Sequence, residues 1–261
     1  MKREISIQLM KSNNMTKYCI IGKHGFVGGA LSKKLESMGY QTTSTPSKDV
    51  AAVFDFGSPV HMPFEQAPDY YIKTLLPKHL YFLSCGIYYV WPSSALVYED
   101  KDLAFINFKK TLEEISLAYP NNLGVRIFPI YGPGETRTAI YQWCRDMNKG
   151  KRPEVWGDGK QKRDFIYIDD VIDNIIESAG IGKSRSKRTG VMDIGAGKPT
   201  AFNKIIKNIN KILNTDLEPV YKKTPKEYSK GIVCQNPVKT KVDIEEGCRA
   251  VLDWIKENDD K

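Results

Sequence analysis

The stretch that decides the fold is YCIIGKHGFVGGALSKKLESMG, residues 18–39. Its first four residues form a short apolar run that ends at Gly22, which predicts a buried strand. Apolar residues then recur at helical spacing up to Gly39, which predicts a helix over residues 30–38 closed by a glycine C-cap. A strand, a glycine-rich turn and a helix in this order predict the start of a β-α-β unit.

The turn itself carries three glycines in the pattern G-x-x-G-x-x-G. The first glycine lets the chain leave the strand sharply, the second leaves no side chain between the backbone and a pyrophosphate, and the third lets the helix pack closely on the sheet. The free N–H groups of the first helical turn then face the phosphates. We therefore predict dinucleotide binding by the whole turn, which consists of Gly22, Lys23, His24, Gly25, Phe26, Val27 and Gly28.

The end of the second predicted strand, residues 41–44, bears on the choice between NAD and NADP. An Asp or Glu about 20 residues after the turn usually binds the ribose 2′-hydroxyl of NAD. Here Thr43 and Ser44 stand at that place with Lys48 close by, and the first acid is Asp49. Hydroxyls beside a lysine suit a 2′-phosphate, so the predicted cofactor is NADP or NAD, with NADP favoured. A plain loop that holds the adenosine end loosely is also compatible with these residues.

The rest of the chain continues the alternation of strands and helices. Short apolar runs predict strands over residues 50–56, 87–91 and 123–128, and helical spacing predicts a helix over 105–117. The repetition favours an α/β fold with a doubly wound parallel sheet. After Pro133 the pattern is mixed, and it predicts a smaller mixed α/β C-terminal lobe folded onto the sheet edge.

Composition excludes several classes of protein. There are 39 Lys and Arg against 31 Asp and Glu, a net charge of +8 that suits either a nucleic-acid surface or a site for an anionic small molecule. The five cysteines are scattered without C-x-x-C spacing, which predicts free thiols, no metal site and a cytoplasmic protein. No apolar run is long enough to span a membrane, and residues 1–16 are predicted to be a flexible extension without a signal-peptide core.

Four further stretches, together with the glycine turn, resemble the extended short-chain dehydrogenase/reductase family, and within it the nucleotide-sugar epimerase/dehydratase branch. They are WPSSALVY (91–98), RIFPIYGPG (126–134), WGDGKQKRDFIYIDDV (156–171) and DIGAGKPT (193–200). The resemblance covers most of the chain from Lys17 to about Trp254. It implies a Rossmann-type domain that binds NAD(P), formed by residues 17–135 and part of 160–195. It also implies a substrate lobe, mainly residues 136–261, that holds a nucleoside-diphosphate sugar.

The resemblance also implies the catalytic groups. Family members usually carry a Ser or Thr after the fourth strand and a Tyr-x-x-x-Lys on the next helix; the tyrosine takes a proton from a sugar hydroxyl while hydride leaves to the nicotinamide. Ser94 and Lys109 match the serine and the lysine. The tyrosine position holds Phe105, which has no titratable group. Tyr98, or a Lys or Asp within residues 99–102, is the alternative base, and His61 is a further candidate for moving the proton.

The remaining binding residues follow from the same resemblance. The family's cofactor-lining segment falls on Phe56, Gly57 and Ser58, and Phe128 is assigned to the cofactor as well. Predicted substrate contacts, besides Ser94, are Pro129, Gln161 and Arg163. Pro129 stands where relatives often place an Asn that binds the diphosphate, and proline has no side-chain donor. Arg163 matches the residue that pairs with the substrate phosphate, although a surface salt bridge would also account for it.

Two functional hypotheses follow. The first is an NAD(P)-dependent enzyme of the epimerase or reductase type acting on a nucleoside-diphosphate sugar; Ala95 and Leu96 stand where the family's 4,6-dehydratases carry an acidic pair. The second is a dinucleotide-binding protein without redox catalysis, a sensor or partner subunit, which Phe105 motivates. Nucleic-acid binding is the least favoured function. The helix at 105–117 corresponds to one through which relatives dimerise, so a homodimer is expected.

Overall fold

Six parallel strands form the central sheet of the computed structural model, which describes residues 15–58, 64–101, 103–182, 186–224, 228 and 231–258. The strand order is β10-β5-β4-β3-β1-β2, and every pairing in this sheet is parallel. The chain passes from β1 to β2 in one direction and from β3 onward in the other, so the sheet is doubly wound. The predicted fold class is confirmed. The strands are β1 (Lys17–Ile21), β2 (Gln41–Thr43), β3 (Ala52–Asp55), β4 (Tyr88–Ser94), β5 (Asn122–Ile127) and β10 (Gly190–Ile194).

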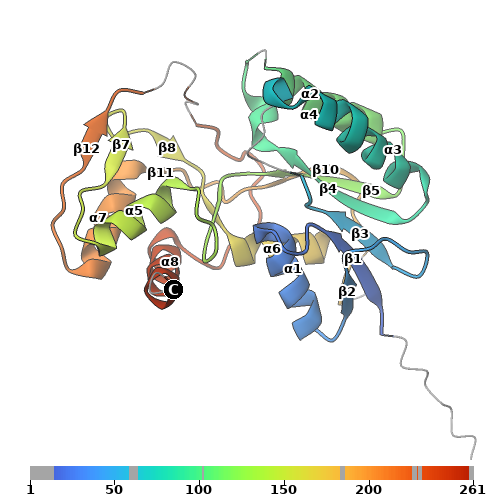
Figure 1. The fold of residues 1–261 in the computed structure, drawn as a ribbon, viewed down its shortest axis with the longest axis horizontal. Coiled ribbons are helices and arrows are strands. Elements are labelled where there is room, and N and C mark those ends of the chain that lie inside the picture. Colours follow the sequence, from blue (N-terminus) through green and yellow to red (C-terminus); the bar gives the residue numbers. More distant parts are fainter. Residues whose placement is uncertain are drawn as a thin grey trace, which may run out of the picture.

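Helices cover both faces of this sheet, which is why the strands are apolar on both sides. In Figure 1, α1 (Phe26–Ser37) and α6 (Ile168–Ser178) lie on one face, and α3 (Leu76–Ser84) and α4 (Ala104–Ser116) lie on the other. Tyr18 and Ile20 of β1 belong to the core under the first pair of helices, whereas Cys19 between them belongs to the core under the second pair. The helix predicted over 105–117 is present as α4.

One helical segment was not predicted, and several element bounds differ from the sequence-based expectation; α1, for example, begins at Phe26, four residues before its predicted start. Between β3 and β4 the chain forms a 3₁₀ turn η1 (Phe64–Gln66), then α2 (Pro68–Tyr70), the π-helical turn η2 (Tyr71–Leu75) and α3, where no element was predicted. β4 continues to Ser94, three residues beyond the predicted end, because Pro92, Ser93 and Ser94 keep pairing with β5. A 3₁₀ turn, η3 (Ala95–Tyr98), follows at once. The flexible extension predicted before β1 lies, up to residue 14, outside the described residues.

The C-terminal lobe is a mixed α/β unit, as predicted. Its helices α5 (Ala139–Asn148), α7 (Phe202–Leu213) and α8 (Ile244–Asn258) pack around buried side chains such as Trp143, Phe202 and Leu252. Three two-stranded ladders complete it and join it to the sheet region (Figure 1). They pair β7 (Glu154–Trp156) with β12 (Val220–Lys222), β8 (Lys162–Arg163) with β11 (Thr200–Ala201), and β6 (Ile130–Tyr131) with β9 (Ile166–Tyr167).

The glycine turn packs as its sequence requires. Gly22 has a φ of +83°, and a Cβ there would stand 2.6 Å from the backbone carbonyl carbon of Phe56. A Cβ on Gly28 would collide with the carbonyl oxygen of Gly22. The first glycine therefore permits both the turn and the close approach of the segment after β3, and the third lets α1 lie against the turn.

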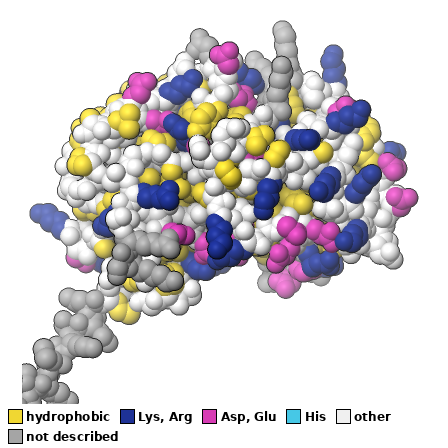
Figure 2. All heavy atoms as spheres, turned by 180° about the vertical axis from the view of Figure 1, so that it is seen from behind, with side chains coloured by type: hydrophobic (Ala, Val, Ile, Leu, Met, Phe, Trp, Pro, Cys, Tyr) yellow, Lys and Arg dark blue, Asp and Glu magenta, His cyan; other side chains and the backbone are white. Residues whose placement is uncertain are grey.

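The surface charge is dispersed on the face that Figure 2 shows. Lys and Arg side chains are spread over this face with Asp and Glu among them. Within the described residues, no helix has both the length and the apolar character that a membrane span requires. All five cysteines are free thiols, in agreement with their spacing.

Candidate active site

A cavity of about 470 Å³ opens at the carboxyl ends of β1, β3, β4 and β5. This is the edge of a doubly wound sheet where ligands bind, and the volume is within the range of small-molecule sites. Its walls come from the glycine turn, the segment after β3, the π-helical turn, the end of β4, α4 and the chain after β5. The lining residues are Gly25, Phe26, Val27, Phe56, Ser58, Tyr71, Leu75, Pro92, Ser93, Ser94, Phe105, Lys109, Ile127, Phe128, Ile130, Glu135 and Arg137.

The glycine turn offers this cavity the start of a helix. α1 begins at Phe26, and its N-cap residue Gly25 makes no side-chain cap hydrogen bond. The turn is closed by the Gly25 N–H, which donates to the Gly22 carbonyl oxygen at 2.8 Å. The first N–H groups of a helix have no intrahelical acceptor, and without a capping side chain they suit phosphate oxygens. The turn therefore fits the diphosphate of a dinucleotide.

Lys23 and His24, also predicted to bind the cofactor, do not line the cavity. The Lys23 ammonium donates to Glu36 at 2.9 Å and to Thr42 at 2.7 Å, and His24 is exposed. Hydrogen bonds from Thr42, Lys23 and Ser32 lower the pKa of Glu36 to about 2. No acid follows β2 closely in the sequence, but the fold brings Glu36 beside this strand from the C-terminal half of α1.

Thr43 and Ser44 lie at the end of β2 and outside the cavity. The Thr43 hydroxyl oxygen accepts a hydrogen bond from the Thr45 N–H at 3.2 Å, and Ser44 is exposed. Phe56, Ser58 and Phe128 line the cavity, as predicted for cofactor contacts. Gly57 does not line it, and its N–H donates to the Asp55 carboxylate at 3.1 Å.

Ser94, Phe105 and Lys109 meet in the cavity wall. Ser94 ends β4, and its hydroxyl oxygen accepts a hydrogen bond from the Leu96 N–H at 3.2 Å. Lys109 is only 6% exposed, its ammonium donates to the Pro92 carbonyl oxygen at 2.8 Å, and it lies 5.8 Å from the centre of the Phe105 ring. The spacing of four residues on α4 places Phe105 and Lys109 on the same helix face.

The position of Lys109 changes its acidity. Burial lowers the pKa of the Lys109 ammonium from 10.5 to about 8, although the carboxylates of Asp55 and Glu113 act in the opposite direction. Burial disfavours the charged form of an amine, which is the cause of the net decrease. The cavity therefore holds an amine with a pKa of about 8.

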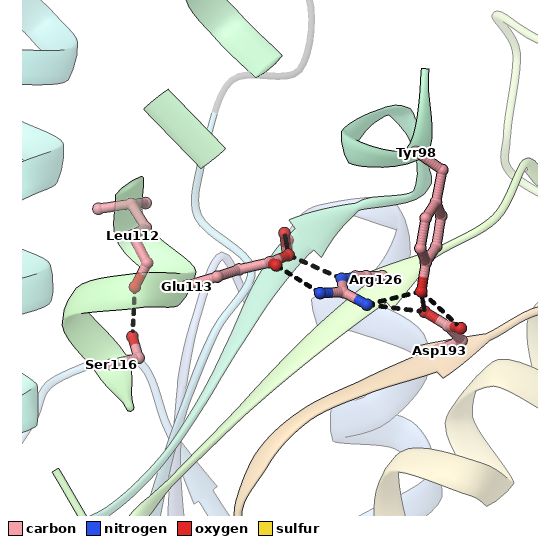
Figure 3. Close-up of polar contacts among 7 residues, drawn as sticks. Tyr98, Leu112, Glu113, Ser116, Arg126 and Asp193 are labelled. Carbon is pink, nitrogen blue, oxygen red and sulfur yellow. Dashed lines mark hydrogen bonds and ion pairs between the residues drawn. The ribbon is translucent and has the colours of Figure 1, made fainter. Parts of the chain in front are cut away.

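Tyr98, the alternative base, does not line this cavity. Its hydroxyl donates to Asp193 at 2.8 Å and accepts from the Arg126 guanidinium at 2.6 Å. Figure 3 shows Arg126 lying between Glu113 on one side and Tyr98 with Asp193 on the other. Burial and the Asp193 carboxylate raise the pKa of Tyr98, and the residue lines a second cavity, of about 680 Å³.

The remaining candidates for the base come from residues 99–102 and from His61. The Lys101 ammonium pairs with the Glu99 carboxylate at 3.0 Å, and no residue from 99 to 101 lines the cavity. Asp102 and His61 lie outside the described residues.

The three other residues predicted to contact substrate lie outside the cavity lining. Pro129 is exposed, and its carbonyl oxygen accepts the Ile166 N–H at 3.0 Å. The Gln161 side chain donates to the Trp156 carbonyl oxygen. The Arg163 guanidinium stacks over aromatic rings of the lobe, 5.0 Å from the ring centre of Tyr228.

The comparisons with known proteins point to one family. Residues 106–180 match the profile of the NAD dependent epimerase/dehydratase family. UDP-glucuronate 4-epimerase of Thermodesulfobacterium geofontis is 30% identical over 167 residues, which are 58% of this chain and 49% of that protein. The matched part of the chain is therefore similar to this family.

More distant relatives of the family extend the match. Probable UDP-glucuronate 4-epimerase of Rhizobium meliloti is 22% identical over 220 residues, 71% of this chain and 64% of that protein. The chain thus spans about half to two thirds of the length of these curated relatives. Among solved structures, UDP-glucuronic acid 4-epimerase from Bacillus cereus, in complex with UDP-glucuronic acid and NAD, has a TM-score of 0.72 at 18% identity. The alignment covers 93% of this chain and 99% of that one, which shows that the fold is shared.

Several residues that line the cavity were missed by the sequence analysis. Ser93 precedes the predicted serine, and its hydroxyl donates to the buried Glu113 carboxylate. Arg137 brings a guanidinium to the cavity and is held by Glu135 at 3.0 Å. Tyr71 comes from the unpredicted π-helical turn.

The Glu113–Arg126 ion pair, which does not line the cavity, was also missed; the charge of Arg126 within the otherwise apolar run 123–128 is the signal that could have found it. Among the described residues, no three His, Cys, Asp or Glu side chains gather as a metal site requires.

Proposed function

We propose that the chain is an NAD(P)-dependent enzyme of the epimerase or reductase type that acts on a nucleoside-diphosphate sugar. The observation that carries the proposal is one cavity that joins the glycine turn to Ser94 and Lys109. The names of the curated relatives, which are UDP-glucuronate 4-epimerases, support a UDP-sugar as the substrate class.

The chain's own residues take the following roles in this proposal. The N–H groups at the start of α1 hold the dinucleotide diphosphate, and Phe56, Ser58 and Phe128 line the space beside it. When bound, the dinucleotide supplies a reversible hydride acceptor. The Ser94 hydroxyl positions the sugar oxygen, and the Lys109 amine orients the hydroxyls of the nicotinamide ribose.

Two guanidiniums are available for the phosphates of the sugar nucleotide. Arg137 lines the cavity, whereas Arg163 lies outside the lining and stacks over Tyr228 in the lobe, so its role requires that the sugar nucleotide extend toward the lobe. A planar guanidinium matches the oxygens of a phosphate in pairs, which is why arginines rather than lysines are assigned to this role.

The test measures binding and turnover separately on the purified full chain. NAD⁺ and NADP⁺ are titrated by calorimetry, and the protein is then incubated with UDP-glucose, UDP-glucuronic acid and UDP-N-acetylglucosamine, with products separated by chromatography. We expect micromolar dinucleotide binding and conversion of at least one sugar. Tighter binding of NADP⁺ would support the predicted preference based on Thr43, Ser44 and Lys48, and tighter binding of NAD⁺ would point to Glu36. Failure to bind either dinucleotide would overturn the proposal.

Phe105 favours a second candidate function, a dinucleotide-binding protein without redox catalysis. It occupies the cavity wall at the place where the family carries its tyrosine. Tight dinucleotide binding without any change in the sugars would support this function over the first.

We also propose that the chain forms a homodimer through the helices on the α3–α4 face. Large apolar side chains of this face are exposed, namely Ile72, Leu80, Tyr81 and, just after α4, Leu117. Exposed apolar groups that cluster on one face mark protein interfaces. We expect a dimer by light scattering, a shift to monomer in the double variant Tyr81→Glu/Leu117→Glu, and no shift in the control Tyr221→Glu on the lobe. A monomeric wild type would contradict the proposal.

We further assign the enzyme to the cytoplasm. All five cysteines are free, and disulfides persist mainly in oxidising compartments.

A further inference from the structure

We propose that Tyr71 supplies the phenolic hydroxyl that Phe105 lacks and carries the proton in the sugar reaction. The inference rests on the proposed function and assigns its proton-transfer group. Tyr71 lines the same cavity as Ser94, Phe105 and Lys109. It is the one tyrosine among the cavity-lining residues that the structure describes.

Tyr71 reaches this cavity from a different element than the family's tyrosine does. Phe105 projects from α4, whereas Tyr71 comes from the chain between β3 and β4, yet the two ring centres are 6.4 Å apart and the rings meet at 86°. The edge of one ring therefore faces the other. A phenol at position 71 and a phenol at position 105 would thus enter the same part of the site from neighbouring walls.

The local backbone explains why this residue faces inward. Tyr71 is the first residue of the π-helical turn η2, in which the Leu76 N–H bonds back to the Tyr71 carbonyl oxygen, five residues earlier. The wider turn places Tyr71 and Leu75 on the cavity side, while Ile72 is exposed. Single π-turns inside helices are frequent at functional sites.

The ring is fixed by its aromatic neighbours. Tyr71 is only 4% exposed, and its ring centre lies 5.1 Å from that of Phe64 and 5.3 Å from that of Phe108. Tyr70 packs edge-on against it at 5.8 Å and does not line the cavity. Such packing holds a catalytic side chain in one orientation.

The proposed sugar oxidation and its reverse each account for one proton and one electron pair. On oxidation, the C–H bond of the sugar carbinol gives its electron pair as hydride to the oxidised dinucleotide, and the O–H proton passes to the Tyr71 phenolate oxygen as the C=O bond forms. On reduction, hydride returns to carbon and Tyr71 donates the proton to the sugar oxygen. Burial raises the pKa of Tyr71, so the resting residue is protonated and can donate in the reduction direction. In the oxidation direction Tyr71 first releases this proton to solvent and then accepts the proton of the sugar hydroxyl.

The decisive variant is Tyr71→Phe, which removes one oxygen atom. We expect kcat to fall at least about 100-fold with KM changed only about twofold, because general acid–base catalysis contributes that much. Tyr70→Phe is the matched control and should retain the wild-type rate. Adding Phe105→Tyr to Tyr71→Phe should restore a large part of the lost rate, since the hydroxyl then enters from the other wall.

A second readout needs neither cofactor nor turnover. A UDP-sugar added to the protein alone should perturb the ultraviolet difference spectrum of a tyrosine in the wild type and in Tyr70→Phe, and this signal should vanish in Tyr71→Phe. Persistence of the signal, or a fully active Tyr71→Phe variant, overturns the role of Tyr71 while the proposed function stands. A wild type that converts no sugar, with activity appearing in Phe105→Tyr, overturns both.

Discussion

The Lys109→Met variant is expected to lose about 1,000-fold in turnover while remaining folded at neutral pH. The amine is the cationic donor deepest in the cavity wall, and removing one preorganised donor from a water-excluded site costs a factor of this order. Methionine fills nearly the same volume, so the packing against Phe105 is kept. Steady-state kinetics and thermal unfolding of the same preparation measure the two effects.

The control for this variant is Lys110→Met, which changes the next residue on the exposed side of α4. It should leave turnover within about twofold of the wild type, as expected of a surface change. A Lys109→Met variant that is as active as Lys110→Met would show that the amine takes no part in the reaction.

Lys109 also predicts a dependence of stability on pH. Its pKa is about 8 in the folded state against 10.5 for a free lysine. Between these values the unfolded chain binds the proton and the folded chain does not, so the free energy of unfolding rises with pH. Relative to Lys109→Met, the free energy of unfolding of the wild type should increase by about 3 kcal/mol as the pH rises from 8 to 10.5. The full increase is present only above pH 10.5. Urea unfolding of both proteins across this range checks the sign.

The Glu113→Ala variant is expected to be the most destabilised single substitution at the sheet, by about 3–5 kcal/mol. The Glu113 carboxylate is 9% exposed and accepts two parallel bonds from Arg126, at 2.9 and 2.6 Å, as well as the Ser93 hydroxyl. Its loss leaves the half-buried Arg126 guanidinium with only the more distant Asp193 carboxylate, at 3.6 Å, and the Glu113 carboxylate is the largest cause of the raised pKa of Arg126.

Glu114→Ala is the matched control, since Glu114 is the neighbouring residue on α4 and is exposed. Its free energy of unfolding should stay within about 0.5 kcal/mol of the wild type. Equal stability of the two variants in urea unfolding would show that the Glu113–Arg126 pair contributes nothing net. The double variant Glu113→Leu/Arg126→Met should recover much of the loss, because apolar groups of similar volume replace both charges.

Local patterns were sufficient to predict the scaffold. The apolar run before Gly22, the helical spacing after it and the repeated strands indicate a doubly wound sheet because each signal lies within a few residues. The same holds for the family, whose motifs are contiguous stretches such as residues 156–171. The extension of β4 through Pro92 was not predictable from local pattern, since it depends on pairing with β5.

The walls of the cavity were only partly predictable. Ser94, Phe105 and Lys109 were found because a motif marks them, and the structure does bring them together. Tyr71 was missed because residues 64–86 carry no periodic signal that separates a π-turn from an ordinary helix. Glu36 was missed because the acid that binds the ribose is expected at the end of the second strand. Glu36 instead belongs to α1 and lies beside β2 only in the folded chain.

The pairing of β10 with β5 has a consequence for the protein while it is being made. All other strands of the sheet lie within residues 17–127, but the place beside β5 is filled only by residues 190–194. Until the ribosome has delivered that segment, β5 presents a bare row of N–H and C=O groups on an already apolar sheet, and such an edge recruits other strands. The edge of β5 therefore stays unpaired during synthesis until residues 190–194, about three quarters of the way along the sequence, are available to pair with it.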